Sequence, residues 1–422
     1  MKSFTRLLFL SAAALAILHP ALAQNRCANT PDYFAPLTSG DGERFPLTIG
    51  PVVWHLLGSG VYPVKGSDGL THVAFAMQFT NVWNLPATVQ SVEVVDAARN
   101  YQPTGANRVI SIKDDDVTNL LKLSTLPQNM EKASYSTKLA AGEYGVMFFD
   151  VTYPNANDVP CAIALRVHVL QPDNKRLPES TMVSPPLELS QQAAIVLAPP
   201  FKGDGWVNAN GCCLEVGPHR FVTNPLNGTL DPSEQFAIDW IKIDAQGKAF
   251  RTDGKKSEDW LCYGVAILAV APGTVVEVMR DLPNEPPGVA PADLNLAHIA
   301  GNHVTLDLGG GRFAMYAHLA PQSVTVHVGD HVKAGDMLGL LGNSGNTTGP
   351  HLHFQISDRP STIDTTSLPF VFQNMLLQSR TSANLDDIET FSISGTPLPI
   401  TSKPAKQLTD SMPLSRDVIT FP

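Results

Sequence analysis

Short apolar runs of strand length, separated by residues that favour turns, constrain the fold of this chain most strongly. Such runs lie at 73–79, 89–94, 145–151 and 161–169, with Pro, Asn and Gly between them. The 31 Gly and 34 Pro among 422 residues agree with many short elements and argue against long helices or a coiled coil. Because 43% of the residues are hydrophobic, the chain can also fill a packed core. We therefore predict an all-β protein.

The first half of the chain has the strand spacing of a β-sandwich. We predict an N-terminal β-sandwich domain, immunoglobulin-like in type, over residues 24–189. Its histidines, His55, His72 and His168, are scattered along the runs and are expected to be structural.

Proline marks the boundary after this domain. The pairs at 185–186 and 199–200 are typical of a semi-rigid spacer, so residues 190–205 are predicted to form a Pro-rich linker. A second β-rich region follows, and the Ser-, Thr- and Pro-rich segment 361–422 is expected to be a C-terminal extension that ends in a tail.

The N-terminus has the pattern of a secretory signal peptide. Lys2 and Arg6 precede the apolar stretch 7–18, and Ala21 and Ala23 form a small-residue cleavage site. We predict a signal peptide over 1–23 and an exported protein, periplasmic or secreted; a buried N-terminal helix is the alternative. No later run reaches the roughly 18 apolar residues of a spanning helix, so no integral membrane segment is expected after cleavage.

Export affects how the cysteines are interpreted. In an oxidising compartment the five cysteines are expected to pair, and the odd number leaves at least one thiol unpaired or bonded to another chain. The pairing is not fixed by the sequence, and the absence of C-x-x-C gives a cysteine zinc knuckle little support. The net charge of −10 argues against nucleic acid as a partner.

The central chemical signal is the pair His351 and His353, which follows a loop rich in Gly and Asn at 341–350. Leu352, Phe354 and Ile356 are typical of a buried strand face. Because alternate residues of a strand share a face, the two imidazoles should project together while Leu352 points into the core. Two adjacent imidazoles suit a metal ion and its reacting water.

Further residues are candidates for the same site. Tyr316 and His318 share one face of another predicted strand, and His219 lies in the short segment 217–221. Asp239 interrupts an apolar run, where a carboxylate is costly unless it is paired or bound to a metal; a salt bridge to Arg or Lys is the alternative. The remaining histidines of this region are expected to be surface or structural residues: His298, His303, His327 and His331.

Several separated motifs occur in a fixed order between residues 211 and 358. They are Gly301-Asn302-His303, Tyr316-Ala317-His318-Leu319, Val328-Gly329-Asp330 and Gly349-Pro350-His351-Leu352-His353-Phe354. In these motifs the sequence resembles the lysostaphin-type (LytM-like) zinc metallopeptidases, whose members cut peptide cross-links in bacterial peptidoglycan. The resemblance implies a lysostaphin-type β-sheet peptidase domain, which we place at 206–360.

The resemblance also implies residue roles. One Zn2+ per chain would be bound by His219, Asp239 and His353, and His318 and His351 would be the catalytic pair. The sequence departs from the family at one point: the usual upstream motif is H-x-x-x-D, whereas His219 and Asp239 are 20 positions apart. A loop inserted at 223–234, rich in Pro, Asn, Gly and Asp, accounts for this spacing if both ends converge from adjacent strands.

The sequence therefore predicts an exported zinc endopeptidase acting on the peptide stems or cross-links of peptidoglycan. Two alternatives stay open. Some members of the family lack zinc ligands and act as non-catalytic wall-binding scaffolds or as activators of another hydrolase. The other possibility is a zinc peptidase whose substrate is protein. The N-terminal domain is expected either to bind the wall or to cover the groove.

Overall fold

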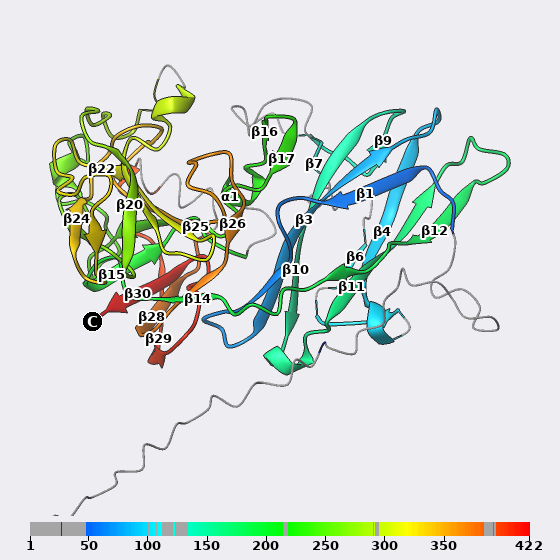
Figure 1. The fold of residues 1–422 in the computed structure, drawn as a ribbon, viewed down its shortest axis with the longest axis horizontal. Coiled ribbons are helices and arrows are strands. Elements are labelled where there is room, and N and C mark those ends of the chain that lie inside the picture. Colours follow the sequence, from blue (N-terminus) through cyan, green and yellow to red (C-terminus); the bar gives the residue numbers. More distant parts are fainter. Residues whose placement is uncertain are drawn as a thin grey trace, which may run out of the picture.

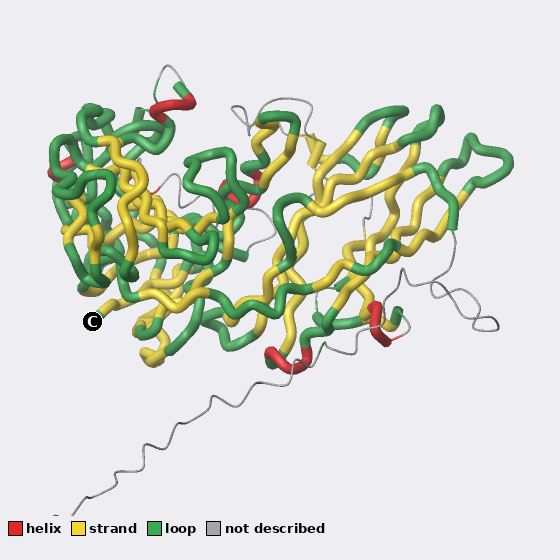
Figure 2. Tube along the Cα trace, in the orientation of Figure 1, coloured by secondary structure: helices red, strands yellow, loops and turns green. Residues whose placement is uncertain are grey.

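A computed structural model describes residues 27, 48–99, 101–106, 108–111, 121–122, 134–213, 218–289, 291, 295–383, 391 and 394–422. The predicted signal peptide lies outside these residues. Strands and loops make up nearly all of the described chain, with only short helical turns (Figure 2), so the predicted all-β class is confirmed. The helical elements are α1 (Pro218–Phe221) and the 3-10 turns η1 (Ala97–Arg99), η4 (Ala156–Asp158), η5 (Ser257–Asp259) and η6 (Leu296–His298). None of the described helices has the length and apolarity to cross a membrane.

Two antiparallel sheets form the first lobe, which we call the N-terminal sandwich (Figure 1). The first sheet has the order β1-β3-β10-β7-β8, with β2 also pairing β3: β1 (Val52–Leu56), β2 (Tyr62–Lys65), β3 (Thr71–Asn81), β7 (Leu121–Lys122), β8 (Ser134–Tyr135) and β10 (Tyr144–Tyr153). The second sheet is built around β4 and β11: β4 (Ala87–Asp96), β5 (Gln102–Pro103), β6 (Val109–Ser111), β9 (Lys138–Leu139), β11 (Ala162–Leu170), β12 (Glu179–Val183) and β13 (Leu187–Glu188).

Strand β3 explains why the hydrophobic alternation of this region is only partial. Val73, Phe75 and Met77 point between the two sheets, where they join one core cluster with β4, β10 and β11. Ala74 and Ala76, on the opposite face, belong to clusters shared with the second half of the chain. Because β3 is buried on both faces, it has no polar side to alternate with. The two-sheet packing agrees with a sandwich, whereas the immunoglobulin-like topology stays a prediction.

A long antiparallel sheet forms the second lobe, which we call the C-terminal lobe. Its order is β23-β20-β21-β22-β25-β18-β15-β30-β28-β29, with β26 also pairing β25. The bounds are β15 (Gly203–Asn208), β18 (Ile238–Lys242), β20 (Gly273–Met279), β21 (Asn302–Asp307), β22 (Phe313–Leu319), β23 (His331–Val332), β25 (Leu352–Ser357), β26 (Ser367–Leu368), β28 (Met375–Thr381), β29 (Ile400–Leu408) and β30 (Asp417–Phe421). Three small pairs accompany it: β14 (Ile195–Leu197) with β27 (Phe370–Phe372), β16 (Asn224–Leu226) with β17 (Thr229–Asp231), and β19 (Ala266–Leu268) with β24 (Met337–Leu340).

The C-terminal segment is part of this sheet. The prediction that it forms an extension ending in a tail is therefore wrong. β30 pairs with β15 on one side and β28 on the other. Ile419 and Phe421 are buried in the main core cluster. Residues 417–421 therefore form a core strand, and their apolar side chains fill the core. The Ser, Thr and Pro around them had suggested a tail.

The predicted linker also contributes strands. β14 pairs in parallel with β27, and β15 starts at Gly203 inside the expected linker. The other expected domain boundaries stay predictions.

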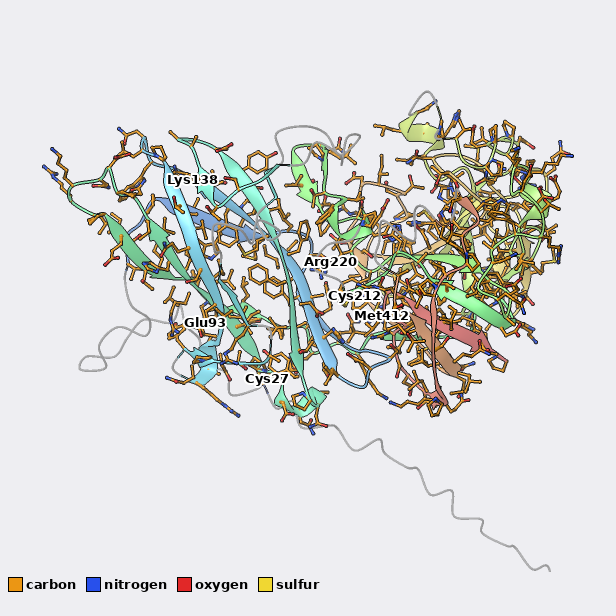
Figure 3. The ribbon with its side chains drawn as sticks, turned by 180° about the vertical axis from the view of Figure 1, so that it is seen from behind. Cys27, Glu93, Lys138, Cys212, Arg220 and Met412 are labelled. Carbon is orange, nitrogen blue, oxygen red and sulfur yellow. A yellow bond between two sulfur atoms is a disulfide. The ribbon has the colours of Figure 1, made fainter. Side chains whose placement is uncertain are left out.

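As predicted, the cysteines form disulfides and leave one thiol unpaired. Cys27 is bonded to Cys161 and Cys212 is bonded to Cys213; Figure 3 labels Cys27 and Cys212. Cys262 is a buried free thiol. Burial raises the pKa of Cys262 to about 12, so this thiol stays protonated and unreactive at neutral pH.

Candidate active site

Three neighbouring strands of the long sheet bring the predicted residues together. β25 lies between β18 and β22, and in this register His353 stands opposite Asp239 on one side and Ala317 on the other. Leu352 is fully buried in the core, as the strand alternation predicts. His351 therefore lies just before β25 on the same side as His353.

The three predicted metal ligands form a compact group around Asp239. His219 Nε2 lies 3.0 Å from Asp239 Oδ2, and His353 Nδ1 lies 3.0 Å from Asp239 Oδ1. One donor atom from each of the three residues lies within 4.8 Å of the others. In a tetrahedral site with bonds of about 2.0–2.1 Å, ligand atoms are about 3.3 Å apart. These spacings suit one zinc ion.

Hydrogen bonds to the opposite ring nitrogens orient both imidazoles. His219 Nδ1 donates to the carbonyl of Ala237 at 3.2 Å, and His353 Nε2 donates to Oε1 of Gln355 at 3.1 Å. In the neutral rings, the lone pairs of His219 Nε2 and His353 Nδ1 then face Asp239. Outer hydrogen bonds of this kind are usual for histidine metal ligands because they fix the tautomer and the ring orientation. The donor set therefore fits a zinc ion with an open position for water.

A hairpin accounts for the long interval between His219 and Asp239. β16 and β17 pair antiparallel between α1, which carries His219, and β18, which carries Asp239. Since the hairpin returns the chain to its starting point, the interval brings both ligands to the same place. The alternative of a salt bridge from Asp239 to Arg or Lys has no support among the described residues, where the charge partners of Asp239 are histidines.

The predicted catalytic pair lies beside the metal ligands. The ring centroids of His318 and His351 are 4.6 Å apart, and His351 Nε2 lies 3.5 Å from Asp239 Oδ1. His351 Nδ1 donates to the Gly349 carbonyl and His318 Nδ1 donates to the Ser344 carbonyl, each at 2.8 Å. Each ring, when neutral, therefore presents Nε2 as a proton acceptor.

The backbone of His318 departs from the strand that carries it. Its φ is +63°, a left-handed value that few non-glycine residues adopt. Strand alternation would place its side chain beside that of Tyr316 in the core. The left-handed turn at the end of β22 directs the His318 side chain toward His351 instead.

Tyr316 is consequently outside the site, and its predicted role beside His318 is wrong. Its side chain is fully buried in the core against Phe354, and its hydroxyl accepts a hydrogen bond from the Val270 amide at 2.8 Å. Burial raises the pKa of Tyr316, so its hydroxyl stays neutral.

Burial and charge act in opposite directions on the candidate ligands. Burial disfavours the charged form of His219, but the charge and hydrogen bond of Asp239 outweigh it and raise the pKa of His219 to about 9. Burial likewise opposes ionisation of Asp239, yet the histidines around it hold the pKa of that carboxyl well below its usual value. Asp239 is therefore an anionic centre, as a metal ligand requires.

In the predicted catalytic pair, burial outweighs the neighbouring negative charge and lowers both pKa values. Burial lowers the pKa of His318 well below its usual value, and the two neighbouring imidazoles further disfavour a positive charge on this ring. Burial also lowers the pKa of His351, and the carboxylate of Asp239 offsets part of this effect. Both side chains are therefore neutral and able to accept a proton at neutral pH.

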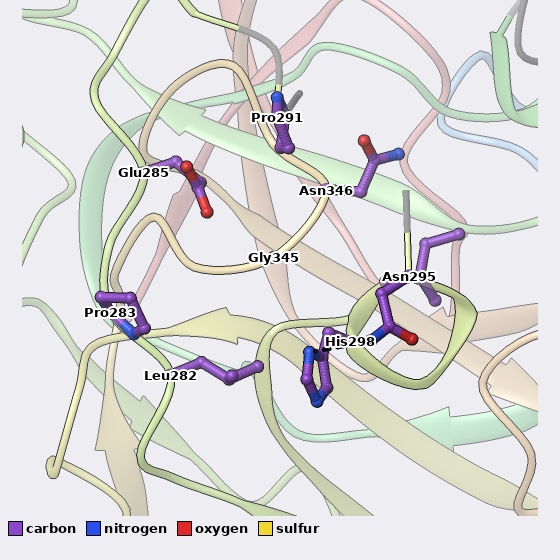
Figure 4. Close-up of a pocket in the computed structure, with 9 residues that line it drawn as sticks. Leu282, Pro283, Glu285, Pro291, Asn295, His298, Gly345 and Asn346 are labelled. Atoms are coloured by element: carbon purple, nitrogen blue, oxygen red, sulfur yellow. Dashed lines mark hydrogen bonds between the residues drawn. The ribbon is translucent and has the colours of Figure 1, made fainter. Parts of the chain in front are cut away.

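A glycine-lined loop holds His318 in place. Gly301 and Gly345, both with positive φ, pack backbone against backbone beside Ser344, and a Cβ on Gly301 would overlap the Ser344 carbonyl that His318 uses. Gly345 also lines a pocket on the neighbouring surface, together with Glu285, Asn295 and His298 (Figure 4). The pocket therefore adjoins the loop that orients His318.

Three further residues touch the site and were not found from the sequence. Asn210 donates to Asp239 Oδ2 at 3.1 Å, Gln355 orients His353, and Glu234 Oε2 lies 3.9 Å from His219 Nε2. Gln355 follows His353 by two positions and therefore shares its strand face, which is a signal that the sequence offers. The positions of Asn210 and Glu234 depend on tertiary packing.

A second group of possible ligands lies at the junction of the two lobes: His72, Asp150 and Cys213. Cys213 is bonded to Cys212 and offers no thiolate. His72 is held between Asp150, at 2.9 Å, and Asp68, at 3.3 Å, which gives it the expected structural role. His303 is also structural, since its Nδ1 donates to the Gly301 carbonyl at 2.8 Å.

Comparison with known proteins agrees with the predicted resemblance. Among curated relatives, "Peptidoglycan DD-endopeptidase ShyA" of Vibrio cholerae is 40% identical over 57 residues, which are 14% of this chain and 13% of the relative. An "Uncharacterized metalloprotease" of Haemophilus influenzae is 35% identical over 102 residues, which are 22% of this chain and 21% of the relative. The chain thus spans about a fifth or less of the length of these relatives.

Solved structures give weaker similarity. The catalytic domain of a mutant form of the prophage-encoded M23 protein EnpA from Enterococcus faecalis covers 40% of this chain and 92% of its own, at 23% identity and a TM-score of 0.24. A zinc containing peptidase from Vibrio cholerae covers 74% and 83%, at 12% identity and a TM-score of 0.22.

A family model gives the most specific match. Residues 256–365 match the model described as "Peptidase family M23", and this span contains His318, His351 and His353 but neither His219 nor Asp239. The resemblance to lysostaphin-type peptidases is therefore confirmed, and residues 256–365 are the part of the chain that matches peptidase family M23.

Proposed function

We propose that this chain is an exported, zinc-dependent endopeptidase that hydrolyses peptide bonds in the stems or cross-links of bacterial peptidoglycan. The observation that carries the proposal is the arrangement around Asp239. Two histidines with oriented rings meet this carboxylate at 3.0 Å each, and two neutral histidines lie beside them.

Each residue of the site has a role that its geometry supports. His219, Asp239 and His353 would hold one zinc ion, which when bound supplies Lewis-acid activation of water and of the scissile carbonyl. His351 is the general base, because its Nε2 faces the site and is unprotonated at neutral pH. His318 orients the substrate or the attacking water through its own Nε2.

His318 could either orient the substrate or stabilise the oxyanion, and its hydrogen bonding favours the first role. Stabilising an oxyanion requires an N–H aimed at it. Since the Nδ1 proton of His318 is used on the Ser344 carbonyl, its Nε2 accepts rather than donates in the neutral ring. We therefore assign His318 the orienting role.

The substrate class comes from similarity. The matched family is one of peptidases, and the Vibrio cholerae relative is named as a peptidoglycan endopeptidase. Peptidoglycan is reached by an exported protein, which is the localisation that the N-terminal sequence pattern predicts.

The proposal is tested by mass spectrometry of peptides released from purified peptidoglycan, with and without a zinc chelator. We expect release that the chelator abolishes and added zinc restores. A folded, zinc-loaded protein that releases no peptide from any of several wall types would contradict the proposal. In that outcome, binding to the wall would support a scaffold, and cleavage of a pure protein substrate would support a protein-directed peptidase.

A further inference from the structure

A buried arginine lies between the candidate zinc site and the N-terminal sandwich (Figure 3). Arg220 directly follows His219 in α1 and is only 1% exposed. Its Nη2 donates to the carbonyl of Phe149 at 2.8 Å and approaches the carbonyl of Phe75 at 3.5 Å. Both carbonyls belong to the first sheet of the sandwich, in β10 and β3.

The next residue of α1 packs against the same sheet. The ring of Phe221 lies 5.3 Å from that of Phe148, and these residues share a small core cluster with Leu57 and Ala76. The guanidinium of Arg220 also lies over the Phe148 ring, 5.8 Å from its centroid. His219 faces Asp239 while its two successors in α1 contact the sandwich, so one short helix joins both.

A second segment of the site is anchored in the same way. Gln235 is buried in the turn between the β16–β17 hairpin and β18, and its Nε2 donates to the carbonyl of Ala74 at 2.9 Å. Its neighbour Glu234 is the carboxylate 3.9 Å from His219 Nε2. The helix that carries His219 and the turn that precedes Asp239 therefore both rest on consecutive carbonyls of β3, those of Phe75 and Ala74.

We infer that the N-terminal sandwich is a structural support of the zinc site. Arg220 is a positioning residue that holds His219 in its ligating orientation. α1 spans four residues, Pro218–Phe221, and its position depends on such tertiary contacts. A buried guanidinium is costly without acceptors, so the sandwich carbonyls fix where Arg220, and with it His219, can lie. This inference rests on the proposed function, since it assumes that His219 binds zinc.

The inference gives the N-terminal sandwich a definite role. If the sandwich covered the groove and had to move away before cleavage, its contact with the C-terminal lobe would have to break without disturbing the site. Here the contact includes fully buried polar groups next to a ligand, so moving the sandwich away would also release His219. The sandwich should therefore stay in place in the active, zinc-loaded protein.

The test is zinc affinity in the full chain, measured by competition with a chromophoric chelator, together with the visible spectrum of the cobalt-substituted protein. Arg220→Met keeps an unbranched side chain along the buried stem of Arg220 and removes the guanidinium with its donors. Gln235→Leu removes the amide donor at the second anchor and keeps an apolar side chain there, so it provides the test if Arg220→Met fails to fold. Arg166→Met is the matched control, because Arg166 bonds to Glu93 and the Tyr101 carbonyl within the sandwich. Figure 3 shows Glu93 well away from Arg220.

We expect Arg220→Met and Gln235→Leu to weaken zinc binding by roughly 10–100-fold, the range found when outer partners of metal ligands are removed. The cobalt spectrum should shift toward weaker coordination, Arg220→Lys should restore part of the affinity, and Arg166→Met should bind zinc like the wild type. Folded Arg220→Met and Gln235→Leu proteins with wild-type zinc affinity would overturn the inference. The proposed function is tested separately, by cleavage of peptidoglycan by the wild-type protein. This inference is tested by the ratio of the zinc affinities of variant and wild-type proteins.

Discussion

Single residues decide the chemistry, and two of them behave differently from what strand alternation alone implies. The pattern at 351–354 predicted the common face of His351 and His353 and the burial of Leu352, because these follow from the two-residue period of a strand. The same rule failed at Tyr316 and His318. A positive φ at His318 breaks the period there, and no local sequence signal marks it.

The role of His318 is tested by its removal. His318→Ala should lower the rate of peptide release by roughly 10²–10⁴-fold, the usual contribution of a positioned acid–base group. The zinc content should stay at one ion per chain, because His318 is not among the ligands. The exposed His327 provides the matched control, His327→Ala, with wild-type activity. Loss of zinc from His318→Ala would contradict the division of roles.

The general-base role of His351 predicts a pH profile. The base acts when neutral, and the neutral form is present above the pKa of His351, which burial lowers from its usual value. The rate should therefore rise with pH, pass its midpoint below about pH 6.5, the usual value for histidine, and stay high at neutral pH. The measurement is kcat/KM for peptide release against pH at saturating zinc. A midpoint well above pH 6.5 would argue against His351 as the base.

At the scale of elements, the sequence predicted strands where a continuous apolar run marks them and missed a core strand among polar neighbours. β3 and β10 are buried on both faces and lack alternation, yet their apolar runs at 73–79 and 145–151 predicted both strands. β30 was missed as a core strand because its neighbours are Ser, Thr and Pro, and its pairing with β15 joins residues distant in sequence. Such pairing is set by tertiary contacts that a local pattern does not contain.

Because β30 lies in the core, shortening one of its buried side chains should destabilise the protein. Ile419 is fully buried, and Ile419→Ala should lower the free energy of unfolding by about 2–5 kcal/mol through lost burial and the cavity left behind. Ile400 in β29 is 38% exposed, so Ile400→Ala is the matched control and should cost much less. Denaturant unfolding measures both. Equal, small effects would mean that residues 417–421 are a tail after all.

His72 links β3 to β10 and gives a stability prediction. Burial opposes its charge, but Asp150 and Asp68 outweigh this and raise the pKa of His72 to about 9. Its stabilisation is therefore fully present below the unfolded pKa of about 6.5 and is lost as the pH rises toward 9, by a few kcal/mol in order of magnitude. Thermal unfolding across this pH interval should show a larger decrease for the wild type than for His72→Gln. Parallel curves for the two proteins would contradict this role.

At the scale of the whole molecule, the two lobes form a continuous structure around the candidate site. Figure 1 shows α1, β16 and β17 between the lobes, and these elements carry or flank His219. The sequence predicted two β-rich regions. Because it also predicted a linker and a tail, it did not indicate that the two regions pack closely against each other. The five candidate residues come from motifs spread between positions 219 and 353, and only the folded sheet and the hairpin bring them together.

The central claim is that His219, Asp239 and His353 hold one zinc ion. Anomalous diffraction at the zinc edge, from crystals of the zinc-loaded protein, tests it most directly. We predict one strong peak bonded to His219 Nε2, an oxygen of Asp239 and His353 Nδ1. A peak at His72 and Asp150 instead, or no peak among the three ligands, would contradict the account.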